Sequence, residues 1–283
     1  MLSSNLLLAV AGIVGLVVGS FLNVVIHRLP RMLERRWQTE YAAHAGTETP
    51  AAERYNLVVP ASACPQCGRK IRPRENVPVL SWLALGGRCA GCKAKISLRY
   101  PLVELLTAAL AVVIVWRFGA TVAGAGALLL VWTLIAAAVI DLDRFLLPDA
   151  LTLPLLWAGL LFNLFDTYVP LAEALIGAVA GYLVLWIVYQ VFRLATGKEG
   201  LGYGDFKLLA ALGAWLGWRM LPLIVFAAAV VGILIGGAWL LIARRGRGQP
   251  VPFGPFLAAG GMLALLAGPA IVQAWIATLY PGH

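Results

Sequence analysis

The chain has 283 residues, of which 61% are hydrophobic and only 12% are charged, and its formal net charge is +9. A soluble domain is typically about 45–50% apolar and about 25% charged. The composition therefore excludes a soluble globular enzyme, and it also excludes a disordered chain, which needs low hydrophobicity. Most of the chain is expected to lie in a lipid bilayer.

Long apolar runs follow one another along the chain and predict membrane-spanning helices, each of which needs roughly 20 mostly apolar residues. The candidate runs are Leu6–Ile26, Pro101–Trp116, Phe118–Ile140, Leu151–Phe165, Leu171–Phe192, Phe206–Trp218, Leu221–Ala243 and Pro255–Leu279. Phe206–Trp218 is short, so a tilted, re-entrant or buried helix is expected there. We predict an all-α polytopic membrane protein with about eight transmembrane helices.

The basic residues predict the orientation of these helices, because Lys and Arg accumulate in cytoplasmic loops. The polar stretch from Arg28 to Arg99 holds 13 of the 22 basic residues, and eight alternating crossings place seven more on the same side. Only Arg117 and Arg219 fall on the other side. The N-terminus is therefore expected outside and the polar stretch inside. Most of the basic excess reflects topology, so no nucleic-acid partner is expected.

This orientation predicts three parts: a first transmembrane helix in residues 1–27, a cytoplasmic domain in residues 28–100 and a membrane domain in residues 101–283. The first apolar run has its basic residues after it, so it is expected to be a retained anchor and not a cleaved signal peptide. The polar stretch Trp37–Pro60 is expected to be a surface excursion.

All four cysteines lie in the cytoplasmic stretch, as Cys64-Pro-Gln-Cys67 and Cys89-Ala-Gly-Cys92. Two C-x2-C pairs supply four thiolates, which can close a tetrahedral shell around a structural Zn²⁺ ion. Two disulfides are the alternative, but a reducing cytosol disfavours them. A redox pair of the thioredoxin type is a further alternative, but no βαβ pattern surrounds either pair. A small cytoplasmic domain with little apolar core also benefits from a metal cross-link.

Acidic residues at the edges of the membrane runs are candidates for function, because ionisable groups are costly there. Asp149 follows Pro148 and precedes a helical run, so it is expected to cap that helix. Asp141 ends an apolar run, where a carboxylate opposes the helix dipole and capping does not explain it. Asp205 ends Gly202-Tyr203-Gly204-Asp205 before the next run, so a capping role and a catalytic role are both open.

The predicted topology places Asp141 and Asp205 at similar depth on the cytoplasmic face. Two adjacent carboxyl groups cannot both ionise easily, so they can share a proton and activate a water molecule for amide hydrolysis. The sequence contains no G-x-S-x-G, H-E-x-x-H or Walker motif. An aspartate dyad is therefore the candidate catalytic apparatus.

Several segments resemble those of a known family. Gly202-Tyr203-Gly204-Asp205 resembles the G-x-G-D signature of intramembrane aspartic proteases, and Ile140–Asp149 is similar to the partner motif of the bacterial type IV prepilin peptidases. Gly19–Pro30, Asn76–Trp82 and Arg99–Leu105 resemble further signatures of that family in the same order. The resemblance covers nearly the whole chain.

The resemblance implies a bifunctional enzyme of the bacterial inner membrane. It would cleave the basic leader from type IV prepilins and type II secretion pseudopilins near the cytoplasmic face, with Asp141 and Asp205 as the catalytic pair. It would then methylate the new N-terminal amine with S-adenosylmethionine. Some relatives lack the four cysteines, so zinc is not expected to be required for cleavage. Glu104 is either a contributor to methyl transfer or a buried polar contact.

The helix dipoles suggest a division of roles within the pair. Asp205 begins a helix, which favours the ionised form, and Asp141 ends one, which favours the protonated form. Asp205 is then the base towards water, although the reverse assignment is open in a coupled pair.

Two other classes of protein fit parts of the sequence. A proton-coupled transporter could relay protons through Asp141 and Asp205, although transporter sites tend to lie nearer the midplane of the bilayer. A membrane-anchored zinc module could bind other proteins without catalysis. Incubation of the purified protein with a prepilin distinguishes both from an enzyme.

Overall fold

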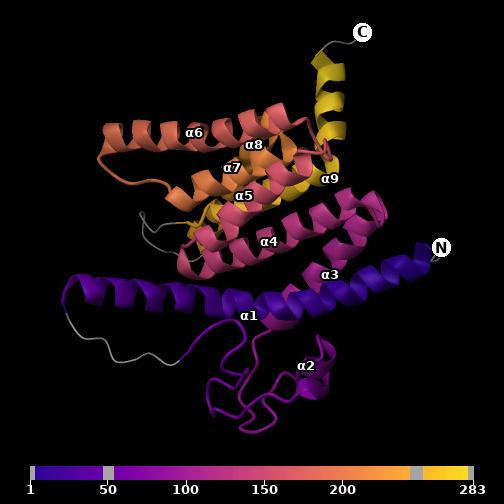
Figure 1. The fold of residues 1–283 in the computed structure, drawn as a ribbon, viewed down its shortest axis with the longest axis vertical. Helices are drawn as coiled ribbons and strands as arrows, with labels where there is room; N and C mark the ends of the chain where they lie inside the picture. Colours follow the sequence, from indigo (N-terminus) through magenta and orange to yellow (C-terminus); the bar gives the residue numbers. More distant parts are fainter. Residues whose placement is uncertain (1–3, 47–53, 243–250, 280–283) are drawn as a thin grey trace. The chain divides into compact units, whose positions relative to one another are not determined.

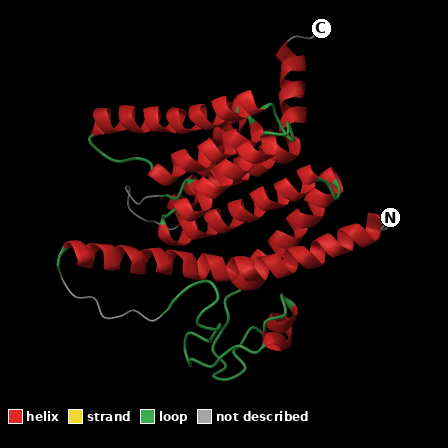
Figure 2. Cartoon of the chain, in the orientation of Figure 1, coloured by secondary structure: helices red, strands yellow, loops and turns green. Residues whose placement is uncertain are grey.

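The computed structural model describes residues 4–46, 54–242 and 251–279. These residues form helices and loops, with two isolated β-bridges and no strand (Figure 2). The prediction of an all-α protein is therefore confirmed. The chain divides into two compact units, Met1–Ala120 and Thr121–His283, and each is described by itself.

The first unit is built on α1 (Ser4–His44) and α3 (Arg99–Phe118), which pack against each other (Figure 1). Glycines on α1 allow a close approach of the two backbones. A Cβ atom added to Gly15 would lie 2.6 Å from the Cα atom of Ala108, and one added to Gly19 would lie 2.7 Å from the Cα atom of Glu104. The expected first transmembrane helix is thus one member of a tight helix pair.

α1 continues well past the apolar run that ends at Ile26. The extension to His44 replaces the start of the expected surface excursion Trp37–Pro60 with exposed helix. Its sequence is rich in strong helix formers such as Leu, Arg, Glu and Met. Arg36 and Glu40 form an i,i+4 ion pair of 2.7 Å, which also supports the helix. The apolar run marks the span, and helix propensity determines where the helix ends.

Between α1 and α3 the chain forms loops, a 3₁₀ turn η1 (Pro73–Glu75) and a short helix α2 (Leu80–Ala84). The isolated bridges Ala63–Lys70 and Arg88–Lys95 close two small loops, one around each cysteine pair.

The second unit contains α4 (Val122–Arg144), α5 (Asp149–Asn163), α6 (Leu171–Thr196), α7 (Tyr203–Leu216), η2 (Trp218–Met220), α8 (Leu221–Ile242) and α9 (Gly254–Leu279). α7 packs against α5, α6 and α9. Eleven of its residues are buried, from Asp205 to Leu216 with the exception of Lys207. A helix that is apolar on all sides belongs in the interior of a bundle. The short run Phe206–Trp218 is therefore the central helix of this unit.

Each predicted apolar run lies mostly on one helix, but three runs extend past it: Phe118–Ile140 begins at the end of α3, Leu151–Phe165 ends two residues after α5, and Phe206–Trp218 ends in η2. Ala243 is outside the described residues. Five described helices are long and apolar enough to cross a membrane: α1, α3, α4, α6 and α9. Tyr203–Leu216 and Trp218–Leu234 together form a sixth candidate that is bent by 120°. α5 has only 15 residues. The protein is thus a multi-pass membrane protein with five or six span candidates, and the number of eight crossings stays a prediction.

The contact between α5 and α7 is fixed by Asn163, a fully buried residue that sequence reasoning did not single out. Its Nδ2 atom donates to the carbonyl oxygens of Ala214 and Trp215, at 2.9 and 3.0 Å. Its Oδ1 atom accepts from the N–H groups of Tyr168 and Val169, at 3.0 and 3.2 Å. Asn163 thereby satisfies carbonyl groups at the C-terminal end of α7 and holds that helix in place.

The close contact between α6 and α7 predicts that one added methyl group there lowers the stability of the protein. Gly177 and Gly213 face each other, and a Cβ atom on either would collide with the backbone of the other. Gly213→Ala is expected to cost about 1–3 kcal/mol of stability, as overpacked sites do. Gly12→Ala is the control, since its Cβ atom would meet only Val112 at an ordinary 3.4 Å. Thermal unfolding in detergent should show a lower midpoint for Gly213→Ala alone, and equal midpoints would contradict the packing argument.

Candidate active site

Asp141 is a buried residue in the last turn of α4. Its Oδ2 atom accepts a hydrogen bond of 3.0 Å from the N–H group of Gly254, the first residue of α9. The first N–H groups of a helix have no partner within it and carry the positive end of the helix dipole. The Asp141 carboxyl group, in the last turn of α4, therefore also caps another helix.

Asp205 is the third residue of α7 and is also buried. Its Oδ2 atom accepts a hydrogen bond of 3.1 Å from the N–H group of Gly202. Its Oδ1 atom is buried and has no hydrogen-bond partner among the described residues. A buried carboxylate oxygen without a partner is costly, so this atom is a candidate to bind water or substrate.

The second unit brings the two aspartates together. α9 packs against both α4 and α7, and the two carboxyl groups are close enough to interact electrostatically. Leu147, in the loop after α4, lies close to the first residues of both α7 and α9. A Cβ atom added to Gly204 would lie 2.6 Å from the Cβ atom of Leu147, and one added to Gly254 would lie 3.1 Å from its Cδ atoms. Small residues at these two positions let the backbone approach the pair closely.

The expected division of roles by helix dipoles loses its basis in this geometry. It assumed that only Asp205 lies at the positive end of a helix. In the structure Asp205 lies in the first turn of α7, and Asp141 faces the first turn of α9. Both carboxyl groups therefore receive the same kind of dipole stabilisation. The contact between Asp141 and Gly254 joins residues 113 positions apart, so the sequence around Asp141 did not reveal it.

The expected capping role of Asp149 is wrong. The N-cap residue of α5 is Pro148, and no side chain caps this helix. Asp149 instead accepts hydrogen bonds from the Nζ atom of Lys207 on both carboxylate oxygens, each at 2.7 Å. Sequence reasoning missed Lys207, although a lysine two residues after Asp205 on a buried helix was a usable signal. The ion pair connects the start of α5 to the first turns of α7.

The four cysteines form a cluster in the first unit. Their four Sγ atoms all lie within 4.8 Å of one another, and they belong to Cys64, Cys67, Cys89 and Cys92. The Sγ atoms of Cys64 and Cys92 are 3.8 Å apart. Thiolates at 2.3 Å from a zinc ion in tetrahedral geometry are about 3.8 Å from one another. The residues present therefore fit a four-thiolate zinc site.

The two cysteine loops have the same backbone design. In the first loop Gly68 donates its N–H group to the carbonyl oxygen of Cys64, and in the second Lys93 donates to that of Cys89. Gly68 and Lys93 both have a positive φ, of 69° and 60°. The N–H groups of Cys92 and Gly91 lower the pKa of the Cys89 thiol to about 6. N–H groups that point at sulfur favour the thiolate, which is the form that binds zinc.

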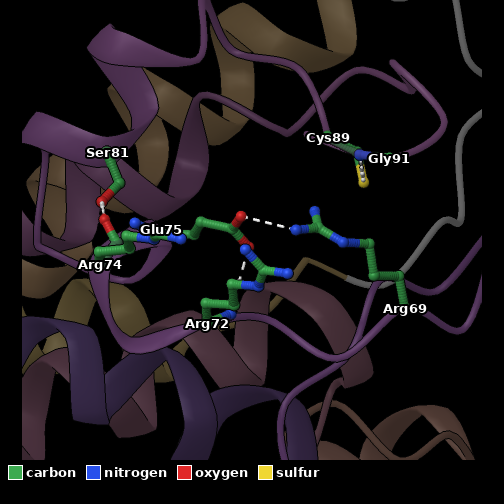
Figure 3. A network of polar contacts seen from close by, with 7 residues as sticks. All are labelled: Arg69, Arg72, Arg74, Glu75, Ser81, Cys89 and Gly91. Atoms are coloured by element: carbon green, nitrogen blue, oxygen red, sulfur yellow. Dashed lines mark hydrogen bonds and ion pairs between the residues drawn. The ribbon is translucent and has the colours of Figure 1, made fainter.

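A polar network of Arg69, Arg72 and Glu75 lies in the same segment as the cluster (Figure 3). Glu75 accepts a 2.7 Å ion-pair hydrogen bond from Arg69 and a 3.2 Å hydrogen bond from the N–H group of Arg72. The pKa of Glu75 is lowered, chiefly by the hydrogen bond from Arg69. Arg69 also packs against Gly91, so that the first cysteine loop and η1 are joined to the second cysteine loop. These contacts therefore connect the cysteine cluster to η1.

Glu104 forms a buried polar contact, one of the two alternatives expected for it. Its Oε2 atom accepts a hydrogen bond of 2.7 Å from the N–H group of Val79, directly before α2. No described contact assigns it to methyl transfer.

The chain matches known sequences over nearly its whole length. Residues 13–118 match the family described as Bacterial Peptidase A24 N-terminal domain, and residues 128–237 match the Type IV leader peptidase family. A prepilin leader peptidase/N-methyltransferase of Aeromonas salmonicida strain A449 is 57% identical over 267 residues, which cover 93% of this chain and 92% of the relative. No solved structure matches the chain significantly.

Two further relatives carry the same name. The protein of Pseudomonas aeruginosa strain PAO1 is 54% identical over 93% of this chain and 91% of its own length. That of Burkholderia pseudomallei strain K96243 is 52% identical over 94% of this chain and 87% of its own length.

The fold and the site define an all-helical membrane protein with a buried aspartate pair and a separate four-cysteine cluster. The matches then show that this chain belongs to the type IV leader peptidase family, whose relatives named above are prepilin leader peptidase/N-methyltransferases.

Proposed function

We propose that this protein cleaves the basic leader from type IV prepilins and type II secretion pseudopilins and then methylates the new N-terminal amine with S-adenosylmethionine. The family and the names of the relatives support both activities. The observation that carries the peptidase activity is the buried pair Asp141 and Asp205, with one carboxylate oxygen that has no partner.

The pair supplies the acid and the base that hydrolysis of a peptide bond needs. One ionised carboxylate takes a proton from water as the water oxygen attacks the scissile carbonyl carbon. The protonated partner donates its proton to the carbonyl oxygen, which gives a tetrahedral intermediate. As this intermediate collapses, the first carboxyl group gives its proton to the leaving nitrogen and the second takes back the hydroxyl proton, which releases the amine of the mature protein. The two carboxyl groups interact electrostatically, so the protonation of one affects that of the other.

The proposed location is the inner membrane of a bacterium, with the aspartate pair near the cytoplasmic face. The distribution of basic residues supports this orientation. A prepilin presents an apolar helix with a basic leader at its cytosolic end. Its scissile bond then arrives near the headgroup boundary, where the ends of α4 and α7 would lie. Residues 1–27 would form the first span, residues 28–100 the cytoplasmic domain and residues 101–283 the peptidase domain.

For the methyl donor we assign no binding residue. The described residues contain no β-strand, so this part of the chain holds no Rossmann-type site for S-adenosylmethionine. When bound, it would supply the methyl group for the amine that cleavage exposes.

The experiment that tests both activities is incubation of the purified protein with a prepilin in detergent. Mass spectrometry should show loss of the leader without any added cofactor, and an added methyl group on the product only when S-adenosylmethionine is present. Binding without cleavage would instead indicate a non-catalytic zinc module. If the protein neither bound nor cleaved the prepilin, the result would favour a proton-coupled transporter.

We further propose that Cys64, Cys67, Cys89 and Cys92 hold a structural zinc ion. Metal analysis of the purified protein should give about one zinc per chain. Cys64→Ser should lose it, because three thiolates bind zinc far less tightly than four, while leader cleavage continues. Gln66→Ala is the matched control in the same loop and should keep the metal. Stoichiometric zinc in Cys64→Ser would contradict the four-thiolate site.

A further inference from the structure

The short helix α2 presents a set of large apolar side chains that the first unit does not cover. Leu80 and Leu83 are 65% and 61% exposed and lie three residues apart, on one face of the helix. The opposite face is attached to the unit: Ser81 is buried, and the Nε1 atom of Trp82 donates to the carbonyl oxygen of Ile96 at 3.3 Å. Leu98, directly before α3, is a further apolar residue with 60% exposure.

A hydrogen bond to α3 determines how deep α2 lies along the membrane-span candidates α1 and α3. Val79, the residue before α2, donates its N–H group to Glu104 at 2.7 Å. Glu104 lies five residues into α3, which is about 8 Å from Arg99 along a helix that rises 1.5 Å per residue. α2 therefore begins level with the interior of a membrane-span candidate.

The residue of α1 that Glu104 faces gives a second measure of how deep α2 lies along the membrane spans. The Cα atom of Glu104 lies opposite Gly19, seven residues before the end of the apolar run at Ile26, or about 11 Å from it. In Figure 1, α2 lies beside the part of α1 that packs against α3, while the polar end of α1 extends away from it. Helices that lie in a membrane interface bury their apolar face about 5–10 Å deep.

The backbone before α2 is strained into this position. Val79 has a φ of 59°, which is rare for a β-branched residue. Its N–H group is held by the buried carboxyl group of Glu104, and Ser81 is held by the N–H group of Val77 and the carbonyl oxygen of Arg74, at 2.8 and 3.0 Å. These contacts fix the direction in which Leu80 and Leu83 project.

The charge of the segment that contains α2 suits an anionic lipid surface. Residues 54–100 contain nine basic residues and one acidic residue, Glu75. The basic residues are Arg54, Arg69, Lys70, Arg72, Arg74, Arg88, Lys93, Lys95 and Arg99. Basic side chains beside an exposed apolar face are typical of segments that bind the headgroup region of anionic membranes.

We propose that α2 is a membrane-interface anchor. Leu80 and Leu83 insert between the lipid acyl chains of the cytoplasmic leaflet, and the surrounding basic side chains contact anionic headgroups. The anchor holds the cysteine cluster against the membrane surface, because Trp82 connects α2 to Ile96 and the second cysteine loop follows α2 directly.

The test measures the contact of α2 with lipid in the full-length protein. A genetically encoded fluorescent amino acid replaces Leu80 or Leu83, and the protein is placed in nanodiscs of anionic phospholipid that carry bromine on the acyl chains close to the headgroup. Bromine quenches fluorescence only on contact. Position 41 is the control: Tyr41 is 78% exposed but lies 18 residues, or about 27 Å, beyond Asn23, which bonds Tyr100 at the start of α3.

We expect the probes at positions 80 and 83 to lose most of their fluorescence and the probe at position 41 to keep it. The probed positions are exposed, so the fold is expected to persist, and helix content by circular dichroism verifies this for each protein. Full fluorescence at both positions of α2 in brominated lipid would overturn the proposal. Quenching by a brominated prepilin helix but not by lipid would also overturn it, and would make the substrate the occupant of this face.

Discussion

Asp141→Asn and Asp205→Asn are each expected to reduce leader cleavage by at least about 10²-fold, the lower end of what general acid–base groups contribute. Asparagine keeps the shape of the side chain and can still accept the N–H bond from Gly254 or Gly202. It can neither take up nor release the proton that the reaction needs. The measurement is the rate at which a prepilin loses its leader in detergent, followed by mass spectrometry.

Asp149→Asn is the matched control for these variants. Asp149 is an aspartate of the same unit that pairs with Lys207, but its side chain is 54% exposed and an exposed ion pair contributes little. Its cleavage rate is expected to stay near that of the unchanged protein. If Asp141→Asn or Asp205→Asn cleaved at a near-normal rate, the pair would not be the catalytic site.

The second large effect is expected from one of the two glycines before Asp205. A Cβ atom at Gly204 would lie 2.6 Å from the Cβ atom of Leu147, so Gly204→Ala has to displace the first turn of α7 or the loop after α4. A shift of about 1 Å between reacting groups can cost about 10²-fold in rate. Gly204→Ala should therefore slow cleavage by about that factor while the protein still folds and inserts.

Gly202→Ala separates this steric effect from a general sensitivity of the segment. Its Cβ atom would meet Asp205 Oδ2 at 3.4 Å and the Gly204 nitrogen at 4.0 Å, which are ordinary contacts, and its φ of −84° suits alanine. The N–H group that bonds Asp205 remains. The rate of Gly202→Ala is expected within a few-fold of normal, and a larger loss than in Gly204→Ala would contradict the packing of Leu147.

The local parts of the structure could be predicted from the sequence. Apolar runs locate the helices because burial in lipid requires helical backbone. The two C-x2-C pairs indicate the sulfur cluster because few other arrangements use four thiolates at that spacing. The glycines before Asp205 mark a close backbone contact, although the residue that they meet, Leu147, lies in another segment.

The long-range parts could not be predicted. The hydrogen bond between Gly254 and Asp141 depends on how α9 packs against α4, and it overturns the assignment of roles that rested on helix dipoles. The burial of α7 and its 120° break from the next helix depend on packing in the same way. A five-residue apolar stretch such as Leu80–Ala84 is too short for sequence periodicity to distinguish it from a loop.

The double variant Asp141→Asn/Asp205→Asn tests the central claim most directly. Groups that act as a unit are not additive, because the loss of one already disables the other. We expect the double variant to cleave prepilin no more slowly than the slower of the two single variants, measured as single-turnover rates in detergent. Rate losses that multiply in the double variant would show that Asp141 and Asp205 act independently, and would contradict a shared catalytic pair.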